Sequence, residues 1–228
     1  MDEAPVWISI NGERRVMLTC SPTAIEALAV GHLIGEGWIE GVADVRSVRS
    51  SVGPGRAHGA DVEIDDARVE RAELLRRHRM EHGCGLRHVL DCTTLSTNRS
   101  ATPSSDDTPI PDLADTFRAL FAAADAAAEG GVHAAALCDH DGVLRYTSVD
   151  VARHCAVDRA IGQACLAGER PSLHGLVISS RISGAIAMKA ANAGLRWIAS
   201  RSIATPLARE IATAAGVALH EQAARRSQ

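Results

Sequence analysis

The segment 81-EHGCGLRHVLDC-92 places one cysteine between two glycines, with basic side chains close by. The glycines leave the Cys84 thiol unobstructed and allow backbone conformations that other residues avoid. If residues 86–92 begin a helix, its dipole, Arg87 and the two nearby histidines favour the thiolate over the thiol. A thiolate is the species that attacks sulfur, so the pattern predicts a cysteine suited to sulfur transfer. An ordinary turn cysteine is the alternative.

The same segment also raises the question of zinc, because four of its side chains are zinc ligand types. They are His82, Cys84, His88 and Cys92. Their C-x7-C spacing matches no common zinc pattern, so a zinc-stabilised structural protein is the weaker alternative and we expect no metal. The zinc deaminase, Walker and Rossmann signatures are absent from the sequence.

A second group of candidate residues stands where predicted strands give way to helices. The segment 150-DVARHCAVDRAIG-162 and the loops 179-SSRISG-184 and 200-SRS-202 are rich in hydroxyl, imidazole and guanidinium groups. Helix starts favour anions, and such side chains donate to phosphate. We therefore predict a phosphate-bearing ligand, although capping would explain the same residue types. The candidate binding residues are Arg153, His154, Asp158, Ser179, Arg181 and Ser200.

The first part of the chain must position the cysteine. A hairpin is predicted over 6–20, turning at Asn11-Gly12, because this dipeptide between β-rich runs favours a two-residue turn. A helix follows, opened by 21-SPT-23. Short strands are expected near 45–52 and 60–65, and the charged segment 66–80 reads as an exposed helix or mobile arm. This N-terminal region, 1–92, ends in the cysteine loop.

The second part of the chain has a regular pattern. Residues 93–111 are rich in Ser, Thr, Pro and Asp, which predicts a flexible loop. Strands are then expected at 132–138, 143–149, 175–179, 195–200 and 216–219, and helices at 112–128, 155–167, 183–193 and 205–215. This alternation predicts an α/β layered sheet with helices, over 112–228. Ligands of such sheets bind at the carboxyl ends of strands.

Composition limits the classes of function. The chain has 228 residues, 46% hydrophobic content and a net charge of −4, so it offers no field for sequence-independent nucleic-acid binding. No apolar run approaches the roughly 20 residues of a membrane span, and the N-terminus reads as no signal peptide. We expect a cytoplasmic protein whose six cysteines are free thiols, with Cys138 and Cys165 in the core.

Four blocks of the sequence resemble the formate dehydrogenase accessory sulfurtransferases, the FdhD family. They are 31-GHLIGEGWI-39, 130-GGVHAAALCDHDGVL-144, 150-DVARHCAVDRAIG-162 and 175–217. The resemblance implies a cytoplasmic protein, usually a homodimer, with a cytidine-deaminase-like core. Family members take persulfide sulfur from a cysteine desulfurase and pass it to the molybdenum or tungsten bis-guanine-dinucleotide cofactor that formate dehydrogenase needs. Cys84 stands where the family's C-G-x-C-G motif has its first, persulfide-carrying cysteine.

The sequence also departs from the family pattern. Arg87 stands where the second cysteine of the motif is expected, and Ala152 and Cys155 replace a glycine and an asparagine. The family's C-terminal G-F-x-R-type loop has no counterpart in 220-HEQAARRSQ-228. Cys92, eight residues after Cys84, is a speculative substitute for the second cysteine.

Two functional hypotheses of different classes follow. In the first, the protein is a sulfurtransferase: Cys84 carries the persulfide, and the candidate phosphate-binding residues seat the guanine dinucleotide. In the second, it is a diverged, non-catalytic chaperone that binds a guanine nucleotide or the cofactor and moves no sulfur. The retained Gly-Cys-Gly favours the first hypothesis, whereas Arg87 and the missing C-terminal pattern favour the second. We prefer the sulfurtransferase.

Overall fold

The computed structural model of the chain describes residues 1–53, 57–80, 111–128 and 130–223, with 74–80 as backbone alone. Its N-terminal elements are β1 (Ala4–Ile10), β2 (Glu13–Cys20), α1 (Ile25–Gly35), β3 (Val45–Val52), β4 (His58–Ile64) and α2 (Asp66–Met80). The later elements are α5 (Ala114–Ala127), β5 (His133–Cys138), β6 (Leu144–Asp150), α6 (Arg153–Leu166), β7 (Gly175–Ile178), α7 (Gly184–Asn192), β8 (Trp197–Ser200), α8 (Pro206–Ala215) and β9 (Ala218–His220). Short 3-10 helices lie at Val42–Asp44 and Pro171–Leu173.

The first four strands form one sheet, called here the N-terminal sheet, in the order β2-β1-β4-β3. β1 and β2 are the predicted hairpin, in which Ile10 pairs with Glu13 across the turn. Asn11 and Gly12 have φ angles of 51° and 80°, the left-handed values that a tight hairpin turn requires. β4 pairs parallel with β1 and antiparallel with β3. The two short strands predicted after the first helix therefore extend the hairpin into a complete sheet.

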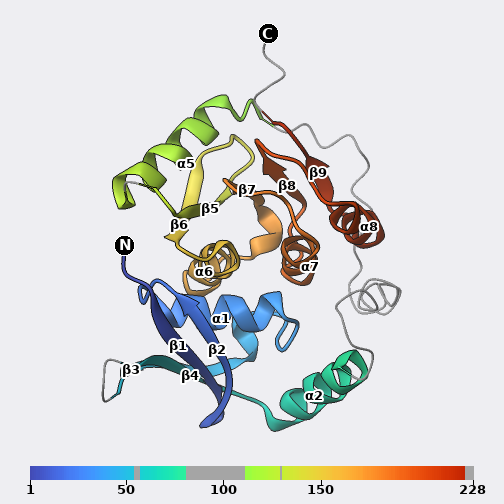
Figure 1. The fold of residues 1–228 in the computed structure, drawn as a ribbon. Coiled ribbons are helices and arrows are strands. Elements are labelled where there is room, and N and C mark those ends of the chain that lie inside the picture. Colours follow the sequence, from blue (N-terminus) through green and yellow to red (C-terminus); the bar gives the residue numbers. More distant parts are fainter. Residues whose placement is uncertain (54–56, 81–110, 129, 224–228) are drawn as a thin grey trace.

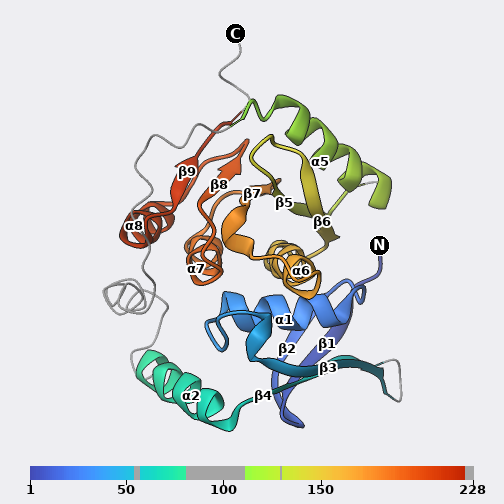
Figure 2. The ribbon, with the colours of Figure 1, turned by 180° about the vertical axis from the view of Figure 1, so that it is seen from behind.

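The other five strands form the central sheet, in the order β6-β5-β7-β8-β9. β5 runs antiparallel to both β6 and β7, and β7, β8 and β9 run parallel to one another. α5 covers one face of this sheet, and α6, α7 and α8 lie along the other (Figure 1). α1 lies between those helices and the N-terminal sheet, as the view from behind also shows (Figure 2). The predicted layered α/β class is confirmed.

Two hydrophobic cores lie on opposite faces of the central sheet. Because successive side chains of a strand point to opposite faces, β5 contributes to both cores. Ala135 and Leu137 belong to the core around α1, α6 and α7, whereas Ala134 and Ala136 belong to the core under α5. The first core continues into the N-terminal sheet through residues such as Ile8. The two sheets thus share one core.

Every strand and helix predicted over 112–219 is present, with ends shifted by no more than two residues. The segment 66–80 is a helix, which confirms one of its two predicted forms. Most of the predicted flexible loop 93–111 lies outside the described residues. The division into regions 1–92 and 112–228 stays a prediction, since residues 81–110 are not described.

Two glycines allow α1 and α6 to pack at very short range. A Cβ atom on Gly31 would lie 1.7 Å from the carbonyl oxygen of Asp158, and one on Gly162 would lie 1.8 Å from that of Ala27. Both distances are far shorter than any real contact, so only glycine fits at either position. This close contact fixes the position of α6, which carries three of the candidate binding residues.

Candidate phosphate-binding edge

One edge of the central sheet gathers most of the candidate residues. Because β5 runs antiparallel to β6 and β7, the start of β5 lies beside the ends of those two strands. β8 is parallel to β7, so its end lies at the same edge. We call this the C-terminal edge. Arg153 and His154 follow β6, Ser179 and Arg181 follow β7, and Ser200 ends β8.

Arg153 and His154 form the first turn of α6 and are half-buried. Their Nε and Nε2 atoms, respectively, are buried and have no hydrogen-bond partner among the residues that the structure describes. Burial, followed by the nearby positive charges of Lys189 and Arg153, lowers the pKa of His154, so this imidazole is neutral at pH 7. Buried polar atoms normally find partners, so two such atoms in adjacent residues keep this turn a candidate for ligand binding.

The loops after β7 and β8 are joined to each other. Ile182 and Ala204 form a parallel bridge, and the Ser200 hydroxyl donates to the Ser180 carbonyl oxygen at 2.7 Å. Ser200 is fully buried, and its oxygen also accepts from the backbone N–H of Ser202 at 2.9 Å. The hydrogen bonds of this hydroxyl are therefore used within the protein, where they fix the two loops side by side.

Ser179 and Arg181 occupy different environments in the first of these loops. The Ser179 oxygen accepts from the backbone N–H of Ala134, at the start of β5, at 2.9 Å. Arg181 is exposed and its guanidinium lies at the surface. Ser183, three residues before Ile186, caps α7 by accepting from the N–H of that residue. The capping alternative is therefore confirmed for Ser183, whereas Ser179 caps no described helix.

Asp158 lies in the second turn of α6, within the protein. Its side chain is 1% exposed; Lys189 donates to its Oδ2 atom at 2.9 Å, and Nδ1 of His32 lies 3.0 Å from the same atom. Lys189 also donates to Glu36 at 2.8 Å. Burial alone would raise the pKa of Asp158, but Lys189 and His32 outweigh it and the pKa is lowered. The carboxylate predicted to bind the cofactor thus holds α1, α6 and α7 together.

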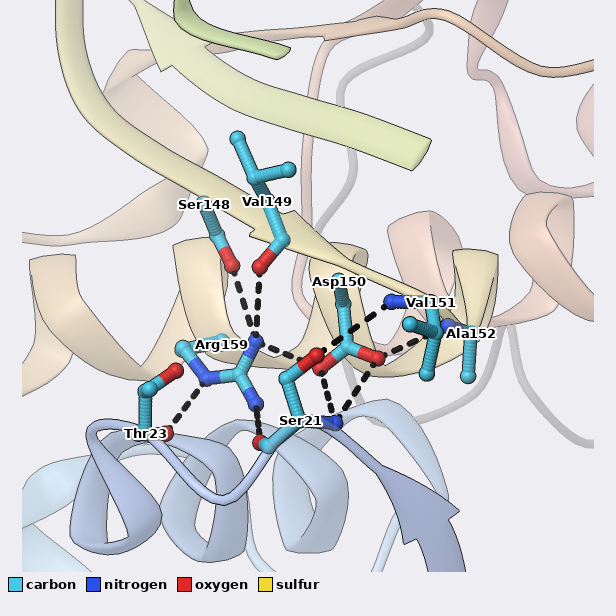
Figure 3. Close-up of polar contacts among 8 residues, drawn as sticks. All are labelled: Ser21, Thr23, Ser148, Val149, Asp150, Val151, Ala152 and Arg159. Atoms are coloured by element: carbon cyan, nitrogen blue, oxygen red, sulfur yellow. Dashed lines mark hydrogen bonds and ion pairs between the residues drawn. The ribbon is translucent and has the colours of Figure 1, made fainter. Parts of the chain in front are cut away.

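Arg159 and Asp150 form a second buried ion pair, at 2.7 Å between Nη1 and Oδ2 (Figure 3). Arg159 donates to the carbonyl oxygens of Ser21 and Thr23, each at 2.8 Å, and Asp150 accepts from the N–H of Ala152 at 2.7 Å. Asp150 is therefore more than a helix cap: it is fully buried and connects the start of α6 to the segment between β2 and α1.

The predicted sulfur-carrying cysteine lies outside the described residues, as do the other members of the zinc alternative. Within the described ranges, no group of three or more His, Cys, Asp or Glu side chains could hold a metal ion. Nor is any described helix long and apolar enough to cross a membrane.

Four cysteines are described, and all are buried: Cys20, Cys138, Cys155 and Cys165. Burial raises the pKa of Cys138 to about 12 and that of Cys165 to about 11, which confirms both as core thiols. The pKa of Cys155 is also raised, first by its hydrogen bond to Cys20 and then by burial. That hydrogen bond lowers the pKa of Cys20, whose side chain nevertheless has no exposed surface. None of the four offers an accessible thiolate.

The structure thus brings five of the six candidate residues to one edge and turns Asp158 inward. Ligand contact by any of them stays a prediction. Sequence reasoning missed His133, which opens β5 at this edge, and it missed the partners of Asp158. Lys189 is the single lysine in a chain with 24 basic residues, but no pattern in the sequence indicates that it contacts Asp158.

Comparison with known proteins gives consistent matches over nearly the whole chain. The model of the FdhD/NarQ family matches residues 1–227. A sulfur carrier protein FdhD from Chromobacterium violaceum is 34% identical over 230 residues, covering 96% of this chain and 82% of that protein. One from Burkholderia cenocepacia is 33% identical over 225 residues, covering 95% and 81%.

Among solved structures, a putative formate dehydrogenase accessory protein from Desulfotalea psychrophila has a similar fold. The TM-score is 0.66 at 20% sequence identity, and the similarity covers 100% of this chain and 84% of that one. At this identity the likeness concerns the fold alone.

Proposed function

Because the chain belongs to the FdhD/NarQ family, we propose that it is a sulfur carrier that moves persulfide sulfur from a cysteine desulfurase to the molybdenum or tungsten bis-guanine-dinucleotide cofactor of formate dehydrogenase or a related oxidoreductase. It acts in the cytoplasm, as a homodimer. The observation that carries this proposal is the family match over residues 1–227, together with curated relatives named sulfur carrier proteins.

In the proposed reaction, the Cys84 thiolate attacks the sulfane sulfur of the desulfurase persulfide. A new S–S bond forms on Cys84, the S–S bond of the donor breaks, and the desulfurase cysteine leaves as a thiolate, so no oxidant is needed. The acceptor then attacks the same sulfane sulfur with an electron pair of its own: the bond from the acceptor to that sulfur forms, the S–S bond on Cys84 breaks, and Cys84 leaves as a thiolate. The choice of Cys84 as the sulfur carrier is supported by the burial of the four described cysteines, because a buried thiol cannot reach a partner protein.

The cofactor is the substrate of this reaction, and the C-terminal edge is its proposed binding site. Arg153 and His154 supply donors in the first turn of α6, Ser179 offers a hydroxyl after β7, and Arg181 adds an exposed guanidinium in the same loop as Ser179. Guanidinium and imidazole donors suit the phosphates of a guanine dinucleotide. Ser200 contributes by holding the two loops together.

One observation favours a second function. Arg87 stands where the family's motif has its second cysteine. A second cysteine would release the carried sulfur by forming a disulfide with Cys84; without it, release depends on the acceptor. A protein that binds the cofactor and moves no sulfur would keep the C-terminal edge and have no need of the pair.

The test is to incubate the protein with a cysteine desulfurase and cysteine and to locate added sulfur by mass spectrometry. We expect a gain of about 32 Da, one sulfur atom, on the peptide that contains Cys84. Cys84→Ser should remove the gain and the rescue of formate dehydrogenase in a strain lacking this protein. Cys92→Ser is the matched control and should retain both.

Two outcomes would decide between the functions. If Cys84→Ser folds and still rescues formate dehydrogenase, the protein is a cofactor-binding chaperone. If sulfur accumulates equally on Cys84 and Cys92, the two share the role, and the double variant should then lose the rescue.

A further inference from the structure

Two buried cysteines, Cys20 and Cys155, contact each other and take no part in the proposed reaction. Cys20 ends β2, and Cys155 lies in the first turn of α6. Their side chains are 0% and 4% exposed, and the two thiols are hydrogen-bonded to each other. Cys155 is also a position at which the sequence departs from the family pattern, where an asparagine is expected. The pair is therefore a feature of this chain rather than of the family.

Hydrogen bonds of the neighbouring residues hold the end of β2 against the start of α6 (Figure 3). Ser21, the residue after Cys20, donates its backbone N–H to the carboxylate of Asp150 at 3.3 Å, and its hydroxyl oxygen accepts from the N–H of Val151 at 3.4 Å. The carbonyl oxygen of Ser21 accepts from Arg159 of α6 at 2.8 Å. The two thiols are thus kept side by side by bonds that do not involve sulfur.

The other two described cysteines are buried in different surroundings. Cys138 donates to the carbonyl oxygen of Gly175 at 3.7 Å, and burial alone raises the pKa of Cys165. Of the four cysteines that the structure describes, Cys20 and Cys155 are the two that contact each other. Contact between two thiols is what a disulfide requires before it can form without a rearrangement of the fold.

We propose that Cys20 and Cys155 are a redox pair, which hydrogen peroxide converts into a disulfide that links β2 covalently to the first turn of α6. The proposal does not depend on the proposed function, in which neither of these thiols carries sulfur.

The hydrogen bond between the thiols decides which of them reacts first. It is the main cause that lowers the pKa of Cys20, and it is also the main cause that raises the pKa of Cys155. Cys20 is therefore the thiol that ionises, and the thiolate is the reactive form of cysteine. Cys155 stays protonated beside it as the thiol that completes the disulfide.

Hydrogen peroxide is the oxidant in this step, because it is small and uncharged and can reach thiols that a partner protein cannot. The Cys20 thiolate attacks one peroxide oxygen: the S–O bond forms, the O–O bond breaks, and hydroxide leaves. The sulfur of Cys155 then attacks the sulfur of Cys20, so that the S–S bond forms, the S–O bond breaks, and a second hydroxide leaves. With the two thiol protons the hydroxides become water, so the two thiols lose two electrons and one peroxide gains them.

The disulfide would change the position of the first turn of α6. The sulfur atoms of a disulfide are about 2.05 Å apart, which is closer than hydrogen-bonded sulfur atoms can come. Oxidation therefore draws the end of β2 and the first turn of α6 toward each other. Arg153 and His154 belong to this turn and shift with it. Because the disulfide also closes a long loop of the chain, the oxidised protein is the more stable form.

The experiment treats the full chain with hydrogen peroxide, blocks the remaining thiols by alkylation and digests the protein with trypsin without reduction. Trypsin leaves Cys20 in the peptide 16–46, Cys155 in 154–159 and Cys165 in 160–181. Mass spectrometry should show the first two peptides joined, and dithiothreitol should separate them. The melting temperature should be about 5–10 °C higher for the oxidised protein than for the reduced protein.

Three variants test the assignment of the pair. Cys20→Ser and Cys155→Asn each remove one of the two thiols, and both should lose the joined peptides and the rise in melting temperature. Cys155→Asn also restores the residue expected from the family pattern, so it decides the question if Cys20→Ser fails to fold. Cys165→Ser is the matched control, because it replaces another buried thiol, and it should retain both effects.

Two results would overturn the proposal. The first is that peptides 16–46 and 154–159 are recovered alkylated and separate after peroxide treatment of the folded protein. The second is that they become joined only when the chain is unfolded in urea, because the pair would then not be preformed. Joined peptides in the folded protein, absent from Cys155→Asn and present in Cys165→Ser, would support it.

Discussion

Two consecutive turns of α6 use the same kinds of side chain in opposite ways. In the first turn, Arg153 and His154 have buried atoms without partners among the described residues. In the second, Asp158 and Arg159 are almost fully buried and are paired with Lys189 and Asp150. Arg153 and Arg159, six residues apart on one helix, therefore differ in whether their hydrogen bonds are spent within the protein.

The ion pairs of the second turn explain how the first turn of α6, the proposed binding turn, is held in a fixed position. The paired side chains of the second turn connect α6 to α1 and α7 and to the segment after β2. They fix the helix, and the helix holds Arg153 and His154 in place although Arg153 Nε and His154 Nε2 have no hydrogen-bond partners among the described residues. Positioning and the proposed ligand binding are thus assigned to neighbouring turns, and each can be tested separately.

The largest effect is expected from Arg159→Met. It leaves Asp150, which has no exposed surface, without its cation. Breaking a buried ion pair by removing one partner costs about 3–5 kcal/mol of unfolding free energy. Urea unfolding would measure this loss. Arg153→Met is the control on the same helix; an equal loss in both variants would contradict the division between the two turns.

A smaller loss, about 2–3 kcal/mol at pH 7, is expected from Asp158→Asn, because Lys189 keeps Glu36 as a second partner. The pKa of Asp158 is lowered in the folded protein. Its stabilising contribution is therefore present above the unfolded pKa, near 3.9, and is lost as pH falls through the folded pKa. Unfolding measured at several pH values should show the two proteins converging in acid. A difference that stays constant down to pH 2 would contradict the ion-pair role.

Gly162→Ala tests the close packing of α1 against α6, on which the position of the second turn of α6 depends. Its methyl group would meet the Ala27 carbonyl oxygen at 1.8 Å, so the helices must separate. Such overpacking costs about 1–3 kcal/mol, and the melting temperature should fall accordingly. Gly41→Ala, where an added Cβ meets nothing within 4 Å, should leave the melting temperature unchanged. Equal melting temperatures for both variants would mean that α1 and α6 can move apart at little cost in stability.

The smallest change in stability is expected from Arg153→Met, below about 1 kcal/mol, because the side chain is half-buried and its Nε atom has no hydrogen-bond partner among the described residues. Binding of guanosine diphosphate-mannose should nevertheless be lost in large part. Calorimetry on the folded variant would measure both quantities. Unchanged affinity would remove the first turn of α6 from the binding site.

Local patterns in the sequence were sufficient to predict the helices, strands and hairpin turn. Asn11-Gly12 predicts its turn because few residue pairs adopt two positive φ angles. The alternation after residue 112 predicts the strands and helices for a similar reason, since each pattern reflects the periodicity of one element. The sequence also predicted that the loops carrying the candidate residues lie at the C-terminal edge, because the loops that follow parallel strands meet at one edge of the sheet.

No local sequence pattern predicts the contacts between residues that are far apart in the chain. Asp158 meets Lys189 and His32 across 31 and 126 residues of sequence, and at the sequence level it is only a polar residue near a helix start. Nor does any local pattern show that β4 returns to pair in parallel with β1. His133 was missed because one histidine at the start of a strand is unremarkable until the pairing sets it beside Asp150.

The burial of Lys189 has a practical consequence for chemical probes. Lys189 carries the one ε-amino group in the chain, and its side chain is 5% exposed and held by two carboxylates. Reagents that acylate lysine, including the common amine-directed cross-linkers, therefore find no ε-amino group on the folded surface. Complexes with other proteins would be better captured through carboxylates or arginines. Acylation of Lys189 would, in turn, report the opening of α1 from α6 and α7.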